Sequence, residues 1–365
     1  MSTPRPRTTT RDPAELERRL GAWVHGWLPG AEVGGLSVPP TNGMSSETVL
    51  FELHRPDRGV QPCVLRLAAD AGAYAVFPRY DMERQYRVIR LVADRTRVPV
   101  PRLLRLETDP GPLGAAGFVM ERVAGRVPPD LMPYTYGGNW LFDASGPERE
   151  RLAAATVEVL AALHAVPAAE AAFLEPSLGP ADSALRHHVE QQRAYYAWVV
   201  AGRPRSPLIE RAFARLEQLW PQEPGPTVLS WGDARIGNIL YQGFEPAAVL
   251  DWEMASLGPR ELDVSWFLFL HQFFQDIAEF FELEGLPDFL RRSDVERRYQ
   301  ELSGSALRDM DFYLTYAALR HAIVMGRIKR RMIHFGEDEV PDDPDDYVMH
   351  RASLDKLLAG TYRWD

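Results

Sequence analysis

Cysteine is nearly absent from this sequence, since Cys63 is the single one among 365 residues. One thiol excludes an internal disulfide and a zinc site built on several cysteines. No apolar run approaches the roughly 18 residues that a membrane helix needs. The basic, Pro- and Thr-rich N-terminus has no apolar segment, so it does not predict a secretory signal. We therefore expect a cytoplasmic protein with no membrane partner, and Cys63 as a small buried apolar residue.

Positive charge is also scarce, with 41 Lys and Arg against 51 Asp and Glu and a formal net charge of −10. No basic cluster is interleaved with aromatic residues in the manner of nucleic-acid binders, so no nucleic-acid partner is expected. An acidic balance is compatible with a cationic small molecule but does not identify one. The sequence gives no indication of the oligomeric state.

The order of the predicted elements divides the chain into two lobes and predicts an α+β fold. Residues 1–12 are expected to form a disordered arm, residues 13–121 a small strand-rich lobe, and residues 122–365 a larger, mostly helical lobe. The lobes meet near residues 121–125, and a junction of this kind is a common place for a small ligand.

Local patterns predict the elements of each lobe. Strands are expected near residues 34–38, 47–53, 63–67, 102–107 and 117–123, and helices at 13–28 and 81–93. In the second lobe, helices are expected at 147–166, 183–220, 260–283, 294–302 and 306–333, interrupted by a strand–loop–strand at 226–251.

Three polar residues follow apolar segments of that interruption. Asp233 comes shortly after an apolar strand, Asn238 lies five residues further (238 − 233 = 5), and Asp251 ends a second apolar strand. A carboxylate can orient an acceptor hydroxyl, and an amide oxygen with a second carboxylate offers the hard ligands that Mg²⁺ prefers. Each residue alone would fit an ordinary turn, but the trio in this order indicates phosphoryl transfer.

These residues resemble the aminoglycoside-phosphotransferase and choline-kinase superfamily, relatives of the protein kinases. Its catalytic loop commonly has the sequence His-Gly-Asp-x-x-x-x-Asn, and Trp231 stands here at the place of the histidine. The resemblance implies a bilobal protein-kinase-like fold that uses ATP and Mg²⁺, with Asp233 as the catalytic residue and Asn238 and Asp251 as metal ligands. It also implies that Asp263 braces the catalytic loop.

The role of Arg235, at a position that is often basic in the family, stays open between a phosphate or substrate contact and a surface ion pair. The Trp-Gly-Asp-Ala-Arg-x-Gly-Asn segment is similar to a subgroup of actinobacterial aminoglycoside phosphotransferases. The same broad family includes kinase-like domains attached to some acyl-CoA dehydrogenases.

The resemblance extends to the nucleotide-binding residues of the first lobe. Ser45 and Ser46 lie in the segment where the family has its phosphate-covering loop, and Arg66 replaces a phosphate-binding lysine. Gln85 aligns with the glutamate that pairs with that lysine. The backbone of the linker that contains Met120, Glu121 and Arg122 is expected to bond adenine.

Several interpretations stay open at this level. The acceptor is either an aminoglycoside-like antibiotic or an endogenous hydroxylated metabolite such as a hydroxyacyl-CoA, and a nucleotide-binding pseudokinase is the alternative to an enzyme. The acidic segment 337–346 is either a solvated loop or an attractant for a polyamine, with the loop favoured. The aromatic residues of 134–142 are either a wall over the acceptor or core packing. Trp266 and His164 are expected to pack in the helical core.

Overall fold

The computed structural model describes residues 11–39, 46–69, 74–175 and 183–364; most of the expected N-terminal arm and Ser45 lie outside these ranges. The chain forms two compact units. The first comprises Met1–Arg90, Pro101–Val123 and Arg327–Val340, and the second comprises Leu91–Val100, Ala124–Gly326 and Pro341–Asp365. The expected α+β fold class is confirmed.

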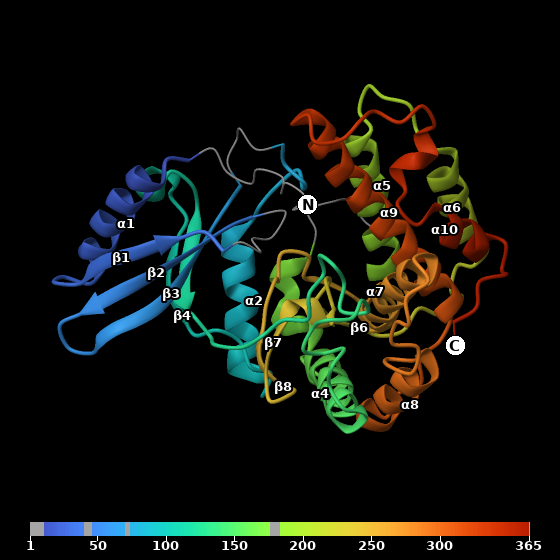
Figure 1. Ribbon diagram of the computed structural model, residues 1–365, viewed down its shortest axis with the longest axis horizontal. Helices are drawn as coiled ribbons and strands as arrows, with labels where there is room; N and C mark the ends of the chain where they lie inside the picture. Colours follow the sequence, from blue (N-terminus) through green and yellow to red (C-terminus); the bar gives the residue numbers. More distant parts are fainter. Residues whose placement is uncertain (1–10, 40–45, 70–73, 176–182, 365) are drawn as a thin grey trace. The chain divides into compact units, whose positions relative to one another are not determined.

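A five-stranded antiparallel sheet forms the centre of the first unit (Figure 1). Its spatial order is β1-β2-β3-β5-β4. The strands are β1 (Glu32–Ser37), β2 (Glu47–Arg55), β3 (Gly59–Leu67), β4 (Leu103–Glu107) and β5 (Gly117–Glu121). Buried residues alternate along much of β2, as expected for a strand with one face on a core.

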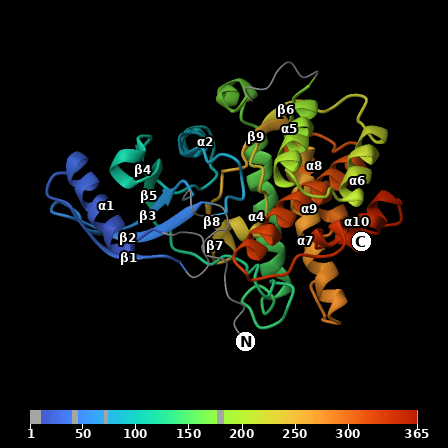
Figure 2. The ribbon, with the colours of Figure 1, turned by 90° about the horizontal axis from the view of Figure 1, so that it is seen from above.

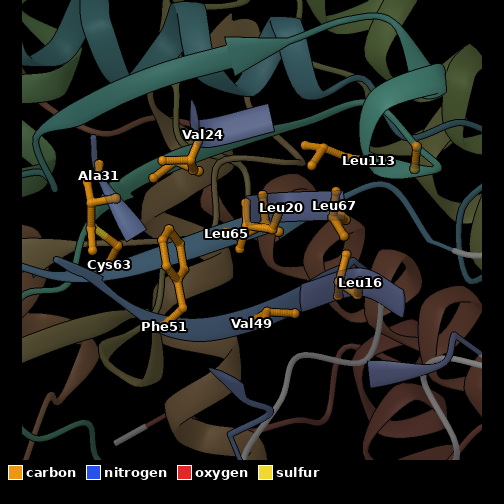
Figure 3. Close-up of a cluster of buried hydrophobic side chains, with 13 residues drawn as sticks. Leu16, Leu20, Val24, Ala31, Val49, Phe51, Cys63, Leu65, Leu67 and Leu113 are labelled. Atoms are coloured by element: carbon orange, nitrogen blue, oxygen red, sulfur yellow. The ribbon is translucent and has the colours of Figure 1, made fainter. Parts of the chain in front are cut away.

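Helix α1 (Pro13–Trp27) covers one face of this sheet, as the view in Figure 2 shows. Asp12 caps its first turn and Pro13 occupies a position that needs no N–H donor, so the sequence sets the start of the helix. Leu20 and Val24 pack with Phe51 and Leu65 of the strands (Figure 3). Cys63 belongs to the same core and is fully buried, as predicted.

Two helices span the division between the units, namely α2 (Met82–Arg95) and α9 (Met310–His334). Between β4 and β5 the chain forms the short helix α3 (Pro110–Leu113), because the Asp109 side chain accepts a hydrogen bond from the Gly111 N–H and caps it.

The second unit is mostly helical (Figure 1). Its helices are α4 (Gly146–His164), η1 (Ala168–Leu174), α5 (Ala184–Val199), α6 (Pro207–Gln218), η2 (Ile236–Asn238), α7 (Glu261–Phe280), α8 (Arg292–Ser303), η3 (Pro344–Tyr347) and α10 (Arg351–Leu358). Segment 183–220 forms two helices, because Ser206 caps a new helix that begins at Pro207.

Two small antiparallel sheets interrupt these helices. One pairs β6 (Thr227–Ser230) with β9 (Ser256–Pro259), and the other pairs β7 (Ile239–Gln242) with β8 (Glu245–Val249). The sequence pattern predicted two strands within 226–251, where the structure has three, and it did not predict β9 or α10. Among the described residues no single helix has the length and apolar character to cross a membrane, and only α4 with η1, bent by 87°, meets those criteria as a pair.

Candidate active site

A tight turn after β6 leads to Asp233. Gly232 has a φ of +89°, in the left-handed region that favours glycine. A methyl group at this position would also overlap the carbonyl oxygen of Met254. Both restrictions require glycine immediately before Asp233.

Asp263, in the first turn of α7, holds this loop from within the unit. Its carboxylate accepts hydrogen bonds from the Ser230 hydroxyl at 2.7 Å and from the backbone N–H groups of Trp231 and Gly232 at 2.7 and 2.8 Å. His164 Nε2 donates a fourth at 3.1 Å. Burial raises the pKa of Asp263, but these donors outweigh burial and lower the pKa below its ordinary value. The bracing role expected for Asp263 therefore has a direct structural basis, and His164 packs as expected.

Three side chains fix the carboxylate of Asp233. Asn238 Nδ2 donates to Oδ2 at 2.6 Å and to the Asp233 carbonyl at 3.1 Å. Arg235 Nε donates to Oδ2 at 3.2 Å, and Trp266 Nε1 donates to Oδ1 at 2.8 Å. The side chain of Asp233 stays 16% exposed, so it remains in contact with solvent.

The two predicted metal ligands, Asn238 and Asp251, lie at the same end of the β7–β8 hairpin. Ile239 pairs with Val249 in the sheet, and the Leu250 N–H donates to the Asn238 carbonyl at 2.8 Å. Asp251 follows at once with a φ of +59°, an uncommon backbone conformation for a residue with a side chain.

Trp231 links the two segments. Its indole N–H donates to the Leu250 carbonyl at 2.9 Å, and its ring lies 5.8 Å from that of Trp252. The tryptophan that stands at the family's histidine position is fully buried and joins the Asp233 loop to the segment that ends in Asp251.

The donor chemistry of Asn238 and Asp251 fits Mg²⁺. The Asn238 amide nitrogen is engaged by Asp233, which leaves its amide oxygen for a cation, and Asp251 adds a carboxylate. Within the described ranges no group of three or more His, Cys, Asp or Glu forms a metal cage. Two protein ligands suit a Mg²⁺ that completes its coordination with phosphate oxygens and water.

Arg235 forms ion pairs with Asp233 and with Asp130, which is 105 residues away in the sequence. Burial lowers the pKa of Arg235, but the two carboxylates outweigh it and raise the pKa above its ordinary value. A methyl group at Gly237 would lie 2.5 Å from Arg235 Nη1 and 2.6 Å from Asp130 Oδ1, so glycine leaves room for this ion pair. No sequence signal singled out Asp130.

The nucleotide-binding candidates belong to the first unit. Arg66 Nη1 donates to Thr48 Oγ1 at 2.8 Å, and Arg66 Nη2 donates to Ser46 Oγ. Gln85 is buried on α2, whereas Glu83, two residues earlier and therefore about 200° away around the helix, is exposed.

Two backbone N–H groups of the segment Met120–Arg122, at the end of β5, are already hydrogen-bonded within the first unit. The Glu121 N–H donates to the Arg102 carbonyl at 2.9 Å, and the Arg122 N–H donates to the Pro62 carbonyl at 3.0 Å. Met120 lies within β5 and pairs with both neighbouring strands.

The aromatic residues near 134–142 differ in burial, since Tyr136, Trp140 and Phe142 are only half-buried. Tyr134 is fully buried and its hydroxyl bonds His271 Nδ1 at 2.8 Å, so it packs in the core. Trp266 is also buried, as expected of a core residue, but its contact with Asp233 was not predicted.

In the acidic segment 337–346, Arg351 forms ion pairs with Asp343 and Asp346.

The antiparallel sheet, the helical unit and the braced Gly-Asp-x-x-x-x-Asn loop define a protein-kinase-like phosphotransferase. The chain belongs to the phosphotransferase enzyme family, whose sequence pattern matches residues 38–302.

Solved structures share this fold. A candidate aminoglycoside phosphotransferase of Ralstonia eutropha is 24% identical with a TM-score of 0.65, over 94% of this chain and 97% of that one. The macrolide 2'-phosphotransferase MphH of Brachybacterium faecium is 18% identical with a TM-score of 0.55, over 93% and 97%.

Curated relatives include the probable acyl-CoA dehydrogenase IBR3 of Arabidopsis thaliana, 26% identical over 69% of this chain and 31% of that protein. The human acyl-CoA dehydrogenase family member 11 is 25% identical over 76% of this chain and 34% of that protein. The chain therefore spans about a third of the length of these relatives.

Proposed function

We propose that the chain is an ATP- and Mg²⁺-dependent kinase that transfers the γ-phosphate of ATP to a hydroxyl group of a small molecule. The observation that carries this proposal is the Asp233 carboxylate, which three side chains hold in place while it stays accessible. Phosphoryl transfer depends on alignment and charge neutralisation, and a fixed carboxylate supplies the alignment.

In the proposed reaction, Asp233 orients the acceptor hydroxyl and takes its proton as the hydroxyl oxygen bonds the γ-phosphorus. The bond between the γ-phosphorus and the bridging oxygen breaks, and ADP leaves. Asn238 and Asp251 would hold Mg²⁺, which neutralises phosphate charge when bound. Arg235 is held beside Asp233 with its charge intact and would contact the phosphate or the acceptor.

In the first unit, Arg66 with Ser45 and Ser46 would bind the phosphates. The segment Met120–Arg122 would contact adenine through its carbonyl groups. Support for a nucleotide and a small acceptor comes from aminoglycoside phosphotransferase APH(4)-Ia, solved in ternary complexes with AMP-PNP and hygromycin B and with ADP and hygromycin B. In these two complexes alanine replaces an asparagine and an aspartate that are five positions apart, the same separation as Asp233 and Asn238.

The acceptor falls in one of two classes. The structural relatives favour an aminoglycoside-like antibiotic, and the acyl-CoA dehydrogenase relatives favour an endogenous hydroxylated metabolite such as a hydroxyacyl-CoA. A panel of hydroxyl compounds from both classes, with ADP release as the readout, separates them.

The test of the proposal combines calorimetry with turnover. We expect ATP binding that requires Mg²⁺ and weakens in Asp251→Ala, and we expect Asp233→Ala to bind MgATP but lose turnover. Asp288→Ala, at a carboxylate whose side chain is 94% exposed, is the matched control. Full turnover by Asp233→Ala would refute the assignment, and MgATP binding without turnover of any acceptor would instead favour a pseudokinase.

A further inference from the structure

The two oxygens of the Asp233 carboxylate have different surroundings. Oδ2 accepts two hydrogen bonds, from Asn238 Nδ2 at 2.6 Å and from Arg235 Nε at 3.2 Å. Oδ1 accepts one, from the indole N–H of Trp266 at 2.8 Å. Because each oxygen of a carboxylate has about two acceptor sites, the remaining site is on Oδ1.

Trp266 holds its own position firmly. It lies on α7, one helical turn after Asp263, and only 3% of its surface is exposed. A buried indole can swing little, so the direction of its N–H bond is set by the packing of the helix. The same helix therefore fixes the backbone of the loop through Asp263 and the carboxylate of Asp233 through Trp266.

A buried cation packs against the Trp266 ring and bonds the backbone just before Asp233. The guanidinium of Arg320, on α9, lies 4.6 Å from the centre of the Trp266 ring, and its Nη2 donates to the Gly232 carbonyl at 3.2 Å. Arg320 is 3% exposed, and this burial lowers the pKa of its guanidinium below the ordinary value. A cation over an indole face is attracted by the ring and holds it in place.

Resting on the function proposed above, we propose that Trp266 is a positioning residue for phosphoryl transfer. Its indole N–H fixes the rotation of the Asp233 carboxylate so that Oδ1 faces the acceptor and takes the hydroxyl proton. The acceptor oxygen then bonds the γ-phosphorus, the bond from that phosphorus to the bridging oxygen breaks, and ADP leaves. Arg320 supports the indole ring and the carbonyl group of the residue before Asp233.

The experiment compares Trp266→Phe with Trp23→Phe. Both variants lose one indole hydrogen bond to a carboxylate, because Trp23 Nε1 donates to Glu107 Oε2 at 2.7 Å in the first unit. Losing a hydrogen bond to a charged group is expected to lower kcat about 10- to 100-fold in Trp266→Phe. The KM for ATP and the calorimetric Kd of MgATP should stay within twofold, and Trp23→Phe should keep the wild-type kcat.

Tryptophan analogues incorporated at position 266 alone keep the test decisive if phenylalanine there disturbs folding. Benzothienylalanine replaces the indole N–H with sulfur at nearly the same shape and should reproduce the loss of kcat. 5-Fluorotryptophan keeps the N–H and should restore it.

Wild-type kcat in Trp266→Phe, or equal losses of kcat and of MgATP affinity, would overturn the positioning role while leaving the proposed function standing. A wild-type chain that turns over no acceptor would instead refute the proposed function, and this inference with it.

Discussion

Asp263→Asn is the substitution with the most clearly calculable effect on this fold. The carboxylate is fully buried and accepts four hydrogen bonds, two at each oxygen. An asparagine keeps one oxygen, and its best orientation places that oxygen toward Trp231 and His164. Its amide nitrogen then faces the Ser230 hydroxyl and the Gly232 N–H. The hydroxyl can rotate and accept a hydrogen bond from this nitrogen, but a backbone N–H can only donate.

The cost follows from that geometry. The buried Gly232 N–H is left without an acceptor, which costs about 1–3 kcal/mol, and the bonds from Trp231 and His164 no longer end on a charge, which removes about half of the roughly 1.5–3 kcal/mol that each contributes. We expect Asp263→Asn to lower the free energy of unfolding by about 3–5 kcal/mol, a large part of the roughly 5–15 kcal/mol of a typical domain.

Urea denaturation followed by circular dichroism at pH 7 measures this difference, with the exposed Asp288→Asn as a control that should match the wild type. The lowered pKa of Asp263 means that its stabilisation is complete above its ordinary pKa of 3.8 and is lost as the pH falls through its folded value. The difference between wild type and Asp263→Asn should therefore shrink below pH 4. A difference under about 1 kcal/mol at pH 7 would refute the reasoning.

Three further outcomes are expected. Gly232→Ala should destabilise the protein far more than Gly243→Ala, because both glycines have positive φ but only Gly232 would clash; equal melting temperatures would contradict this. Burial lowers the pKa of His350 to about 4, so its contribution to stability is present above pH 6.5 and falls by about 1.4 kcal/mol per pH unit between 6.5 and 4. Urea midpoints at pH 7, 6 and 5 should decline less steeply in His350→Gln, and parallel declines would argue against it. Burial raises the pKa of the Cys63 thiol to about 12, so Ellman's reagent should label it only after denaturation, and rapid labelling of the native protein would refute this.

Local patterns in the sequence determined most elements of this fold. Asp12 with Pro13 and Ser206 with Pro207 start helices by local capping, and alternating apolar residues set β2. Strand β9, which the pattern missed, depends on a distant partner. β9 is four residues long and contains Gly258 and Pro259, and it is a strand because it pairs with β6.

The identity of the candidate site also came from the sequence, because Asp233, Asn238 and Asp251 have chemical types and spacings that indicate phosphoryl transfer. The contacts that hold these side chains in place were not predicted from the sequence. Trp266 lies 33 residues from Asp233, so only folding brings it into contact.

The contacts of Asp130 and of the backbone N–H of Arg122, just after β5, illustrate the same limit. Nothing around Asp130 predicts its ion pair with Arg235, which forms across 105 residues. Arg122 donates to Pro62 because β5 lies beside β3. Capping, turns and strand alternation depend on neighbours within a few residues, so the sequence alone determined them. Only the tertiary structure decided the hydrogen bonds that orient a carboxylate, since these join side chains that packing brings together.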